Sequence, residues 1–224
     1  KSLAVEHNVA VVGGDTSIAD KLLISACLIG HAPYRPIRRS GAKRRNDIYV
    51  TGTLGDSALG LQLLKNKMLR KKGAGYLVNR HHKPTPRVAV GALLARKGLA
   101  TAMIDISDGL LQDLGHICRA SLVGARIWEE AVPLSGAYRE LVGSERTRYA
   151  LTGGEDYELL FCARQRDRQL IDQLQNQIKA PVTRIGVCVP ADQGISSLDR
   201  SGKPISVPTI GYDHFKNKTA GISD

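Results

Sequence analysis

The chain has few aromatic residues and no long hydrophobic run. Aromatic residues make up 4% of its 224 residues, which argues against the stacking surfaces that bind single-stranded nucleic acid. No apolar segment approaches the roughly 20 residues that span a bilayer. The sequence also opens without the apolar core of a secretory signal peptide. We therefore expect no membrane span and a cytoplasmic location.

Cysteine pairs and several familiar enzyme motifs are also absent. The four cysteines are scattered without a Cys-x-x-Cys spacing, which argues against a disulfide framework or a zinc site and favours reduced, buried thiols. The pair His81-His82 has no further ligand at metal-binding spacing, so we interpret it as surface. A Walker A lysine motif is missing, and any ATP site is therefore not of the P-loop type.

Acidic residues are outnumbered, since 32 Lys and Arg face 21 Asp and Glu and give a formal net charge of +11. Such a charge raises the hypothesis of nucleic-acid binding. The basic residues concentrate in two runs, 35–45 and 65–72, and neither contains interleaved aromatics or a nucleic-acid motif. The first run includes Arg38, Arg39 and Lys43 as candidate phosphate contacts, whereas the second is expected to be a solvated face. We expect no nucleic-acid partner.

The apolar pattern alternates between strand-like and helix-like segments, which is typical of an α/β or α+β sandwich. Strands are predicted over residues 9–12, 22–29, 47–51, 102–106, 125–128, 157–163 and 182–187, and a hairpin is predicted to join 195–198 to 204–207. One helix is predicted to begin at Asp56 or Ser57 and to bury Leu61, Leu64 and Met68. A second is predicted over residues 87–97 and ends at Gly98. Two more are predicted, one with Leu110, Leu114 and Ile117 on its buried face and one over residues 170–178.

The domain organisation is read from a basic connector over residues 32–46, which contains prolines and glycine. Only two strands precede it, and two strands cannot bury a core alone. The chain is therefore predicted to begin in the middle of a domain. We divide it into residues 1–34, the remnant of an N-terminal domain, and residues 35–224, a C-terminal domain.

Three glycine-flanked acidic clusters carry most of the functional information. They are Gly13-Gly14-Asp15-Thr16, Asp105-Ile106-Ser107-Asp108-Gly109 and Gly153-Gly154-Glu155-Asp156-Tyr157-Glu158. Each places a carboxylate where an apolar run meets a tight turn. In a chain that is otherwise cationic, such localised carboxylates suggest Mg²⁺-bridged binding of polyanionic ligands. A nucleotide-dependent enzyme is the function that this pattern favours.

The second cluster has the most specific geometry. Ile104 and Ile106 point to one face of the predicted strand, so Asp105 faces the other, where it could hold Mg²⁺. Ser107 and Asp108 are expected at the N-cap of the next helix, where free N–H groups and the helix dipole favour phosphate. The alternative is that one of them only caps the helix, which leaves Asp105 unexplained.

The other glycine clusters have simple structural alternatives. The Gly13-Gly14-Asp15 segment could be a turn closed by an Asx hydrogen bond. Glu155 could cap a turn instead of accepting hydrogen bonds from a substrate amine or ring. Glycines at 52, 55 and 60 superficially resemble a dinucleotide fingerprint, but the spacing is wrong, and we interpret them as packing in a strand–turn–helix unit.

In chain order, these motifs resemble those of the thiamine-monophosphate kinase family in the aminoimidazole-ribonucleotide-synthetase-like superfamily. The matching segments are residues 12–16, 39–43, 49–57, 80–84, 104–117, 151–159 and 211–215. The pair formed by Asp-x-Ser-Asp-Gly-Leu at 105–110 and Gly-Gly-Glu-Asp-Tyr-Glu-Leu at 153–159 is quite specific within the superfamily.

The resemblance implies the C-terminal α/β sandwich domain of that superfamily, preceded by the last strands of a truncated N-terminal α/β domain. It also implies direct, Mg²⁺-assisted transfer of the γ-phosphoryl group of ATP onto thiamine monophosphate, giving thiamine diphosphate. By analogy, the implied roles are magnesium binding by Asp15, Asp105 and Asp108, ATP binding by Gly14, Asp15, Arg39 and Ser107, and contact with thiamine by Glu155 and Tyr212. No side chain is assigned as a catalytic base, because a phosphate monoester has a second pKa of about 6 and is ionised at neutral pH.

Members of the family carry a half-domain upstream of the Gly-Gly-Asp motif that supplies more aspartates and helps to build a dimer. The resemblance therefore implies a homodimer for the full-length protein. Two alternatives remain open. One is a sister ATP-dependent enzyme of the superfamily, similar to selenophosphate synthetase or aminoimidazole ribonucleotide synthetase. The other is a chain that folds but has no activity.

Overall fold

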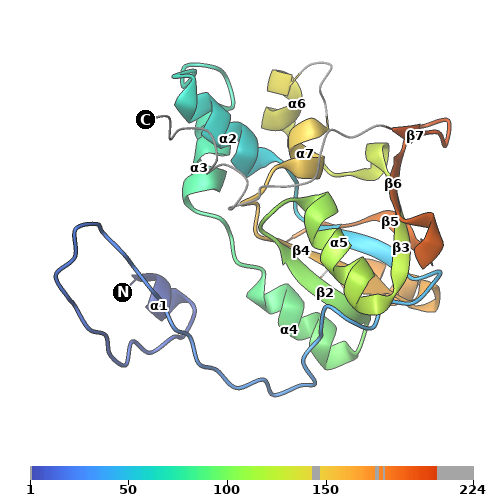
Figure 1. The fold of residues 1–224 in the computed structure, drawn as a ribbon, viewed down its shortest axis with the longest axis horizontal. Coiled ribbons are helices and arrows are strands. Elements are labelled where there is room, and N and C mark those ends of the chain that lie inside the picture. Colours follow the sequence, from blue (N-terminus) through green and yellow to red (C-terminus); the bar gives the residue numbers. More distant parts are fainter. Residues whose placement is uncertain (1, 143–146, 175–176, 179, 206–224) are drawn as a thin grey trace, which may run out of the picture. The chain divides into compact units, whose positions relative to one another are not determined.

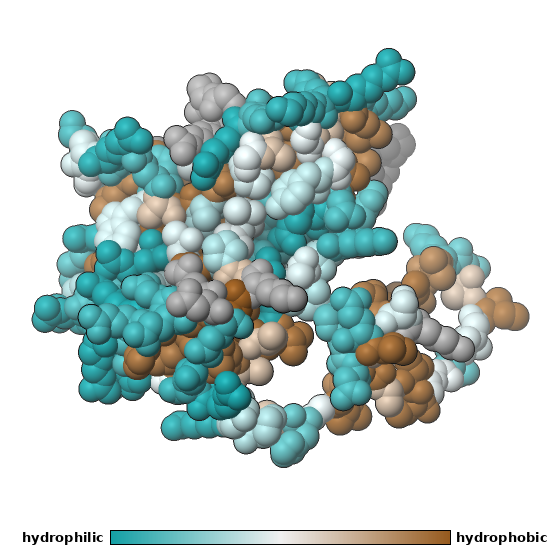
Figure 2. All heavy atoms as spheres, turned by 180° about the vertical axis from the view of Figure 1, so that it is seen from behind, coloured by the Kyte–Doolittle hydropathy of each residue, from teal (hydrophilic) through white to brown (hydrophobic). Residues whose placement is uncertain are grey.

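The computed structural model describes residues 2–142, 147–174, 177–178 and 180–205, and the chain divides into two compact units, Lys1–Pro33 and Tyr34–Asp224. In the first unit, α1 (Ser2–Glu6) is the helix described. The strands predicted over 9–12 and 22–29 are wrong, because the described residues of this unit include no strand. Its apolar side chains are exposed, as Figure 2 shows, with Val12 at 96%. A strand needs a paired neighbour, and this unit supplies none.

In the described part of the second unit, seven strands form one sheet in the order β2-β4-β1-β5-β3-β6-β7 (Figure 1). The strands are β1 (Asp47–Thr51), β2 (Ala100–Ile106), β3 (Val123–Trp128), β4 (Glu158–Ala163), β5 (Val182–Pro190), β6 (Ile195–Leu198) and β7 (Pro204–Ile205). Neighbouring strands are antiparallel except for β3 and β6, which are parallel. The predicted α/β fold class is confirmed.

Helices cover both faces of this sheet. They are α2 (Asp56–Lys65), α3 (Ala74–His82), α4 (Val88–Lys97), α5 (Leu110–Ser121), α6 (Gly136–Val142), α7 (Arg148–Thr152) and α8 (Arg168–Leu174), with short 3-10 turns at Glu129–Ala131, Gln165–Asp167 and Ala191–Gln193. Alternate residues of β4 enter different cores: Leu160 packs with α2, α3 and α5, and Phe161 packs with α4 and α8. Figure 1 shows α2, α3, α6 and α7 grouped at one end of the sheet.

The predicted helices form, except that α8 is Arg168–Leu174 rather than 170–178. The predicted buried face of α2 is wrong. In α5, Leu110, Leu114 and Ile117 are fully buried as predicted, and Gly98 ends α4 with a left-handed φ of 61°. In α2 the buried leucines are Leu59 and Leu63 rather than Leu61, Leu64 and Met68. The cause is α3, which was not predicted and which packs against the face of α2 that carries Gly60. It approaches so closely that a Cβ on Gly60 would lie 2.2 Å from the Leu77 carbonyl oxygen.

The basic connector runs along the free edge of β2, the first strand of the sheet. The N–H of Met103 donates to the carbonyl of Arg38 at 2.9 Å. A Cβ on Gly41 would lie 2.4 Å from the Thr101 carbonyl oxygen. Ser121 Oγ accepts the N–H groups of Gly41 and Ala42. This segment therefore covers an edge that would otherwise present unpaired backbone groups.

The sequence predicts buried, reduced cysteines and no membrane span. Cys118, Cys162 and Cys188 are free and buried as predicted, whereas Cys27 is free but exposed, so the expectation is wrong there. Among the described residues, no helix is both long enough and apolar enough to cross a membrane.

Candidate functional site

The second and third acidic clusters meet where β2 and β4 adjoin. Ser107 O accepts the N–H of Glu155 at 2.8 Å, and Ile106 O accepts the N–H of Tyr157 at 2.9 Å. A Cβ on Gly154 would lie 2.3 Å from the Ser107 carbonyl oxygen, so glycine is required for this approach. Two motifs that are almost 50 residues apart therefore form a single site.

The paired motifs carry three carboxylates, Asp105, Asp108 and Glu155. Asp105 is exposed at the end of β2 while Ile104 and Ile106 are buried on the opposite face, which confirms its predicted orientation. Burial, followed by the charges of Glu155, Asp105 and Asp108, raises the pKa of Tyr157. The Tyr157 hydroxyl also donates to Glu155 Oε2 at 3.3 Å. Carboxylate oxygens of this kind are suitable ligands for Mg²⁺.

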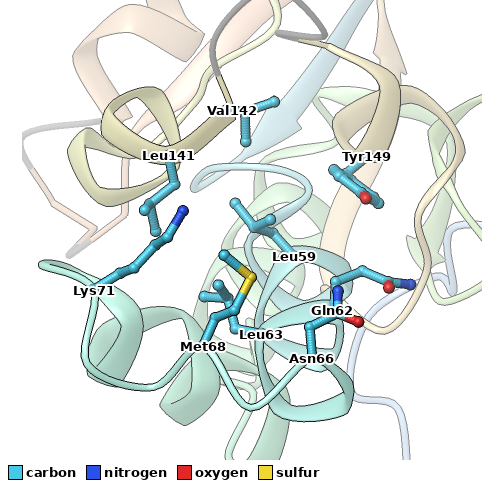
Figure 3. A pocket seen from close by; sticks show the side chains of 9 residues that line it. All are labelled: Leu59, Gln62, Leu63, Asn66, Met68, Lys71, Leu141, Val142 and Tyr149. Atoms are coloured by element: carbon cyan, nitrogen blue, oxygen red, sulfur yellow. The ribbon is translucent and has the colours of Figure 1, made fainter.

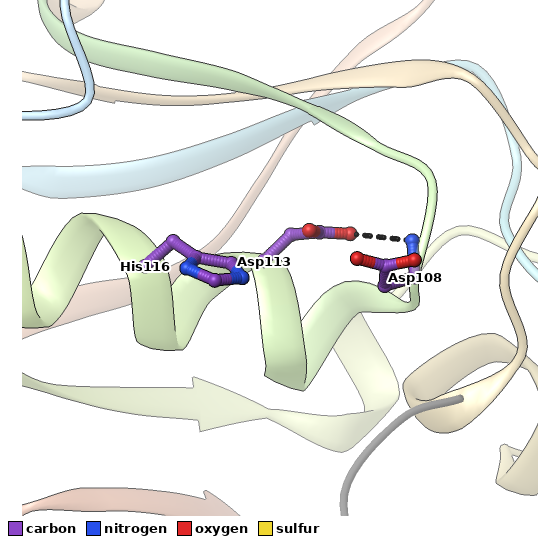
Figure 4. A group of neighbouring side chains, drawn as sticks. All are labelled: Asp108, Asp113 and His116. Atoms are coloured by element: carbon purple, nitrogen blue, oxygen red, sulfur yellow. Dashed lines mark hydrogen bonds between the residues drawn. The ribbon is translucent and has the colours of Figure 1, made fainter. Parts of the chain in front are cut away.

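The start of α5 differs from the prediction. Gly109 is its N-cap, and neither Ser107 nor Asp108 caps the helix through its side chain. Instead, Asp113 Oδ2 accepts the N–H groups of Ser107, Asp108 and Gly109 at 3.0–3.1 Å, and Figure 4 shows the bond to Asp108. Burial raises the pKa of Asp113, although these bonds oppose the rise. The backbone donors expected to bind phosphate are therefore already occupied.

Asp108, Asp113 and His116 offer ligand atoms within 4.8 Å of one another (Figure 4). His116 follows Asp113 by three residues, a spacing that places both on one face of a helix. His116 Nδ1 lies 3.1 Å from Arg119, and Asp113 is engaged by the backbone. Asp108 is consequently the member of the cluster with the freest oxygens.

Asp156, a member of the third acidic cluster, holds the turn between β1 and α2. Its carboxylate accepts the N–H groups of Gly55 at 2.6 Å and Ser57 at 3.1 Å. Ser57 Oγ in turn lies 2.9 Å from His81 Nδ1. His81 is half-buried, so its interpretation as surface is wrong, whereas His82 is exposed. The motif drew attention to Asp156, but its partners are about a hundred residues away in the sequence.

Glu158, the last residue of the third acidic cluster, is the centre of a buried ion network that was not predicted. Glu158 is fully buried and accepts hydrogen bonds from Arg80 at 2.9 Å, from two nitrogens of Arg87 at 2.6 Å, and from the Thr51 hydroxyl at 2.6 Å. A Cβ on Gly52 would collide with the Glu158 carboxylate. The network ties β1 and β4 to α3, through Arg80, and to the segment after it, through Arg87.

These elements enclose a cleft of about 700 Å³. It is lined by Ala58, Leu61, Gln62, Lys65, His81, Ser107, Asp108, Arg148, Tyr149, Thr152, Gly153, Gly154 and Glu155. Its walls carry both basic and acidic side chains. A smaller neighbouring hollow of about 280 Å³ (Figure 3) is lined largely by apolar groups such as Leu59, Leu63 and Leu141 and contains no carboxylate. We therefore take the larger cleft as the candidate active site.

The other site residues predicted from the sequence are placed as follows. Ser107, Asp108 and Glu155 line the cleft. Arg39 is exposed at the edge of β2, and its carbonyl accepts the Ser121 hydroxyl. In the first unit, Gly14 and Asp15 are exposed, and Asp15 Oδ1 accepts the N–H of Thr16 at 2.8 Å. Tyr212 lies outside the described residues.

The buried carboxyl group of Asp156 is expected to make the stability of the fold depend on pH. Burial, and then the charge of Asp56, raises its pKa from 3.8 to about 7. Between pH 3.8 and about 7, the folded state therefore keeps a proton on Asp156 that the unfolded state releases. The stabilisation that this bound proton gives the folded state is lost as the pH rises through that range. We expect the stability of the native chain, relative to Asp156→Asn, to fall over this window. Urea unfolding of both proteins across the window checks it, and parallel curves would contradict it.

The chain resembles known proteins over most of its length. The family model described as AIR synthase related protein, C-terminal domain, matches residues 46–199. The thiamine-monophosphate kinase of Salmonella typhimurium is 41% identical over 213 residues, covering 93% of this chain and 64% of that protein. The enzyme of the same name from Bacillus subtilis is 33% identical and covers 96% and 67%.

A solved structure described as AaThiL complexed with AMPPCP and TMP is 31% identical, with a TM-score of 0.65, covering 80% of this chain and 54% of that one. The chain thus spans about two thirds of the length of these curated relatives and about half of the solved chain.

Proposed function

Because the chain belongs to the thiamine-monophosphate kinase family of AIR synthase related proteins, we propose that it phosphorylates thiamine monophosphate to thiamine diphosphate with ATP. The observation that carries the proposal is the meeting of the two acidic motifs, which brings Ser107, Asp108 and Glu155 to one cleft. A relative whose structure is described with AMPPCP and TMP supports ATP and thiamine monophosphate as the substrates.

The residues present suit magnesium. Asp105 and Asp108 are proposed as its ligands, and so is Asp15, since all three offer hard carboxylate oxygens. Bound Mg²⁺ would supply charge neutralisation at the phosphoryl group being transferred. Gly14, Arg39 and Ser107 are proposed to contact ATP, with Ser107 acting through its side chain because its N–H donates to Asp113.

The cleft suits an acceptor that carries both signs of charge. Lys65 and Arg148 line it together with Asp108 and Glu155, and thiamine monophosphate combines a cationic ring with a phosphate. The backbone of Glu155 has a left-handed φ of 69° and is fixed by its bond to Ser107 O. Its carboxylate is proposed to accept from the amine of the substrate. Tyr212 is proposed as a second contact with thiamine. The acceptor phosphate is ionised at neutral pH, and no side chain is needed to deprotonate it.

The proposal includes a cytoplasmic location and a homodimer, as the resemblance implies. The main test is turnover of ATP and thiamine monophosphate by the 224-residue chain with Mg²⁺, with mass detection of thiamine diphosphate. Product that requires Mg²⁺ supports the proposal. A folded chain that forms no product contradicts it for this polypeptide, and phosphorylation of another acceptor would favour the sister-enzyme alternative.

His81 is expected to contribute to acceptor binding. Its Nδ1 is engaged by Ser57, so the ring is oriented and Nε2 is the nitrogen left for a ligand in the cleft. We expect His81→Ala to raise KM for thiamine monophosphate about tenfold, the value of one hydrogen bond to a partly charged ligand, with a smaller change in kcat. Steady-state kinetics measures both constants.

The neighbouring residue provides a matched control. His82 is exposed and does not line the cleft, so His82→Ala should leave both constants unchanged. Equal effects of the two substitutions would show that His81 acts through the stability of α3 rather than through the acceptor.

A further inference from the structure

A second concave site lies on the face of the sheet covered by α4, opposite the face that α5 covers. It has a volume of about 490 Å³ and lies between the edge segment 35–43, the end of α4, the start of β2 and the residue after β4. It shares no lining residue with the candidate active site. Ile37 and Ala100, which line it, pack on the core of α4 and α8.

Every charged side chain that lines this pocket is basic. Its lining includes Arg35, Arg38, Lys43 and Arg164, together with the hydroxyls of Ser40 and Thr101, and it includes no carboxylate. Within the described residues, the side chains of Arg35, Arg38 and Lys43 form no hydrogen bond or ion pair. The contrast is with Arg80 and Arg87, whose charges are matched by Glu158.

Two of these basic residues, Arg164 and Arg38, are held in place by hydrogen bonds to the rest of the fold. Arg164 is fixed by Asp167 at 2.6 Å and by the carbonyl of Gly98 at 3.0 Å. The backbone of Arg38 is fixed to β2 by its bond to Met103. Like charges that line one pocket raise the free energy of the folded state unless an anion neutralises them. The arrangement is therefore preorganised for an anionic ligand.

We propose that this pocket binds a small anion with two or more phosphate groups. Arginine guanidinium groups match phosphate oxygens with paired donors, and three unpartnered cations call for a multiply charged ligand. The pocket is compact, whereas nucleic acid is usually bound along an extended basic track. The site is separate from the proposed reaction and needs neither Mg²⁺ nor Asp105.

Inorganic pyrophosphate is a suitable probe, titrated calorimetrically into the 224-residue chain in EDTA so that metal-dependent binding at the cleft is suppressed. We expect one saturable site. Arg35→Gln combined with Arg38→Gln should weaken binding at least tenfold. Arg70→Gln, which removes an exposed charge outside the pocket, should leave it unchanged, and so should Asp105→Asn.

Three results would overturn the proposal. Binding that the double substitution does not weaken would place the anion elsewhere. An equal loss in Arg70→Gln would show a response to net charge alone. Displacement of pyrophosphate by short duplex RNA at far lower concentration would identify the surface as a nucleic-acid site. Each outcome is independent of whether the chain phosphorylates thiamine monophosphate.

Discussion

Replacement of Glu158 by glutamine is expected to destabilise the fold by about 3–5 kcal/mol, the usual cost of removing one member of a buried charge network. Glu158 is fully buried and is the shared acceptor of Arg80 and Arg87, whose side chains are 10% and 16% exposed. Glutamine keeps the shape but leaves two guanidinium groups without a negative partner. Urea unfolding followed by circular dichroism measures the difference.

A surface pair offers the matched control for this substitution. Glu140 lies 3.4 Å from Lys72, and their side chains are 51% and 89% exposed. An exposed pair of this kind contributes between zero and about 1 kcal/mol, so Glu140→Gln should change the stability little. Similar losses in both variants would mean that the Glu158 network is not a main source of stability.

Elements with a strong local pattern could be predicted from the sequence. The helix with Leu110, Leu114 and Ile117 and the strand that orients Asp105 were predicted correctly, because side-chain periodicity alone determines which face is buried. The strands over 9–12 and 22–29 were not, since a strand depends on a neighbour as well as on its own residues. The same applies to α2, whose buried face is chosen by its contact with α3.

The site was predictable in its motifs but not in its supporting contacts. The glycines and carboxylates of the two clusters were recognised as functional because their types and spacing are unusual. The partners of Asp156 and Glu158 lie 71 to 107 residues away along the chain. The hydrophobic periodicity of a sequence does not indicate which distant residues will form hydrogen bonds with one another. Asp113 was overlooked for a different reason: a carboxylate within the first turn replaced the expected N-cap.

The supporting contacts explain how the site is kept in place. Asp156 fixes the turn at Gly55, and Glu158 fixes the strand beneath it, while the residue just before them, Glu155, faces the cleft. One short segment thus presents a functional carboxylate and anchors it through the next residues. Because its anchors are buried, substitutions at Asp156 and Glu158 should act mainly on stability, whereas substitutions at the exposed carboxylates should act on activity.

Asp105→Asn gives the sharpest test of that division. Asp105 is exposed at the end of β2, so asparagine should preserve the fold while removing the charge that is proposed to hold magnesium. We expect Mg²⁺-dependent formation of thiamine diphosphate to fall at least about a hundredfold, the scale of losing one electrostatic contact to the transferred phosphoryl group. Mass detection of product and urea unfolding measure activity and stability on the same preparation.

The control is Asp192→Asn, which removes an exposed carboxylate in the turn after β5 and should leave turnover unchanged. Added Mg²⁺ should partly restore the Asp105 variant if weakened metal binding is the cause, because a raised dissociation constant can be overcome by concentration. Full activity of Asp105→Asn at limiting Mg²⁺ would contradict the proposal that this residue binds magnesium. A loss of stability equal to the loss of activity would place Asp105 among the structural carboxylates with Asp156 and Glu158.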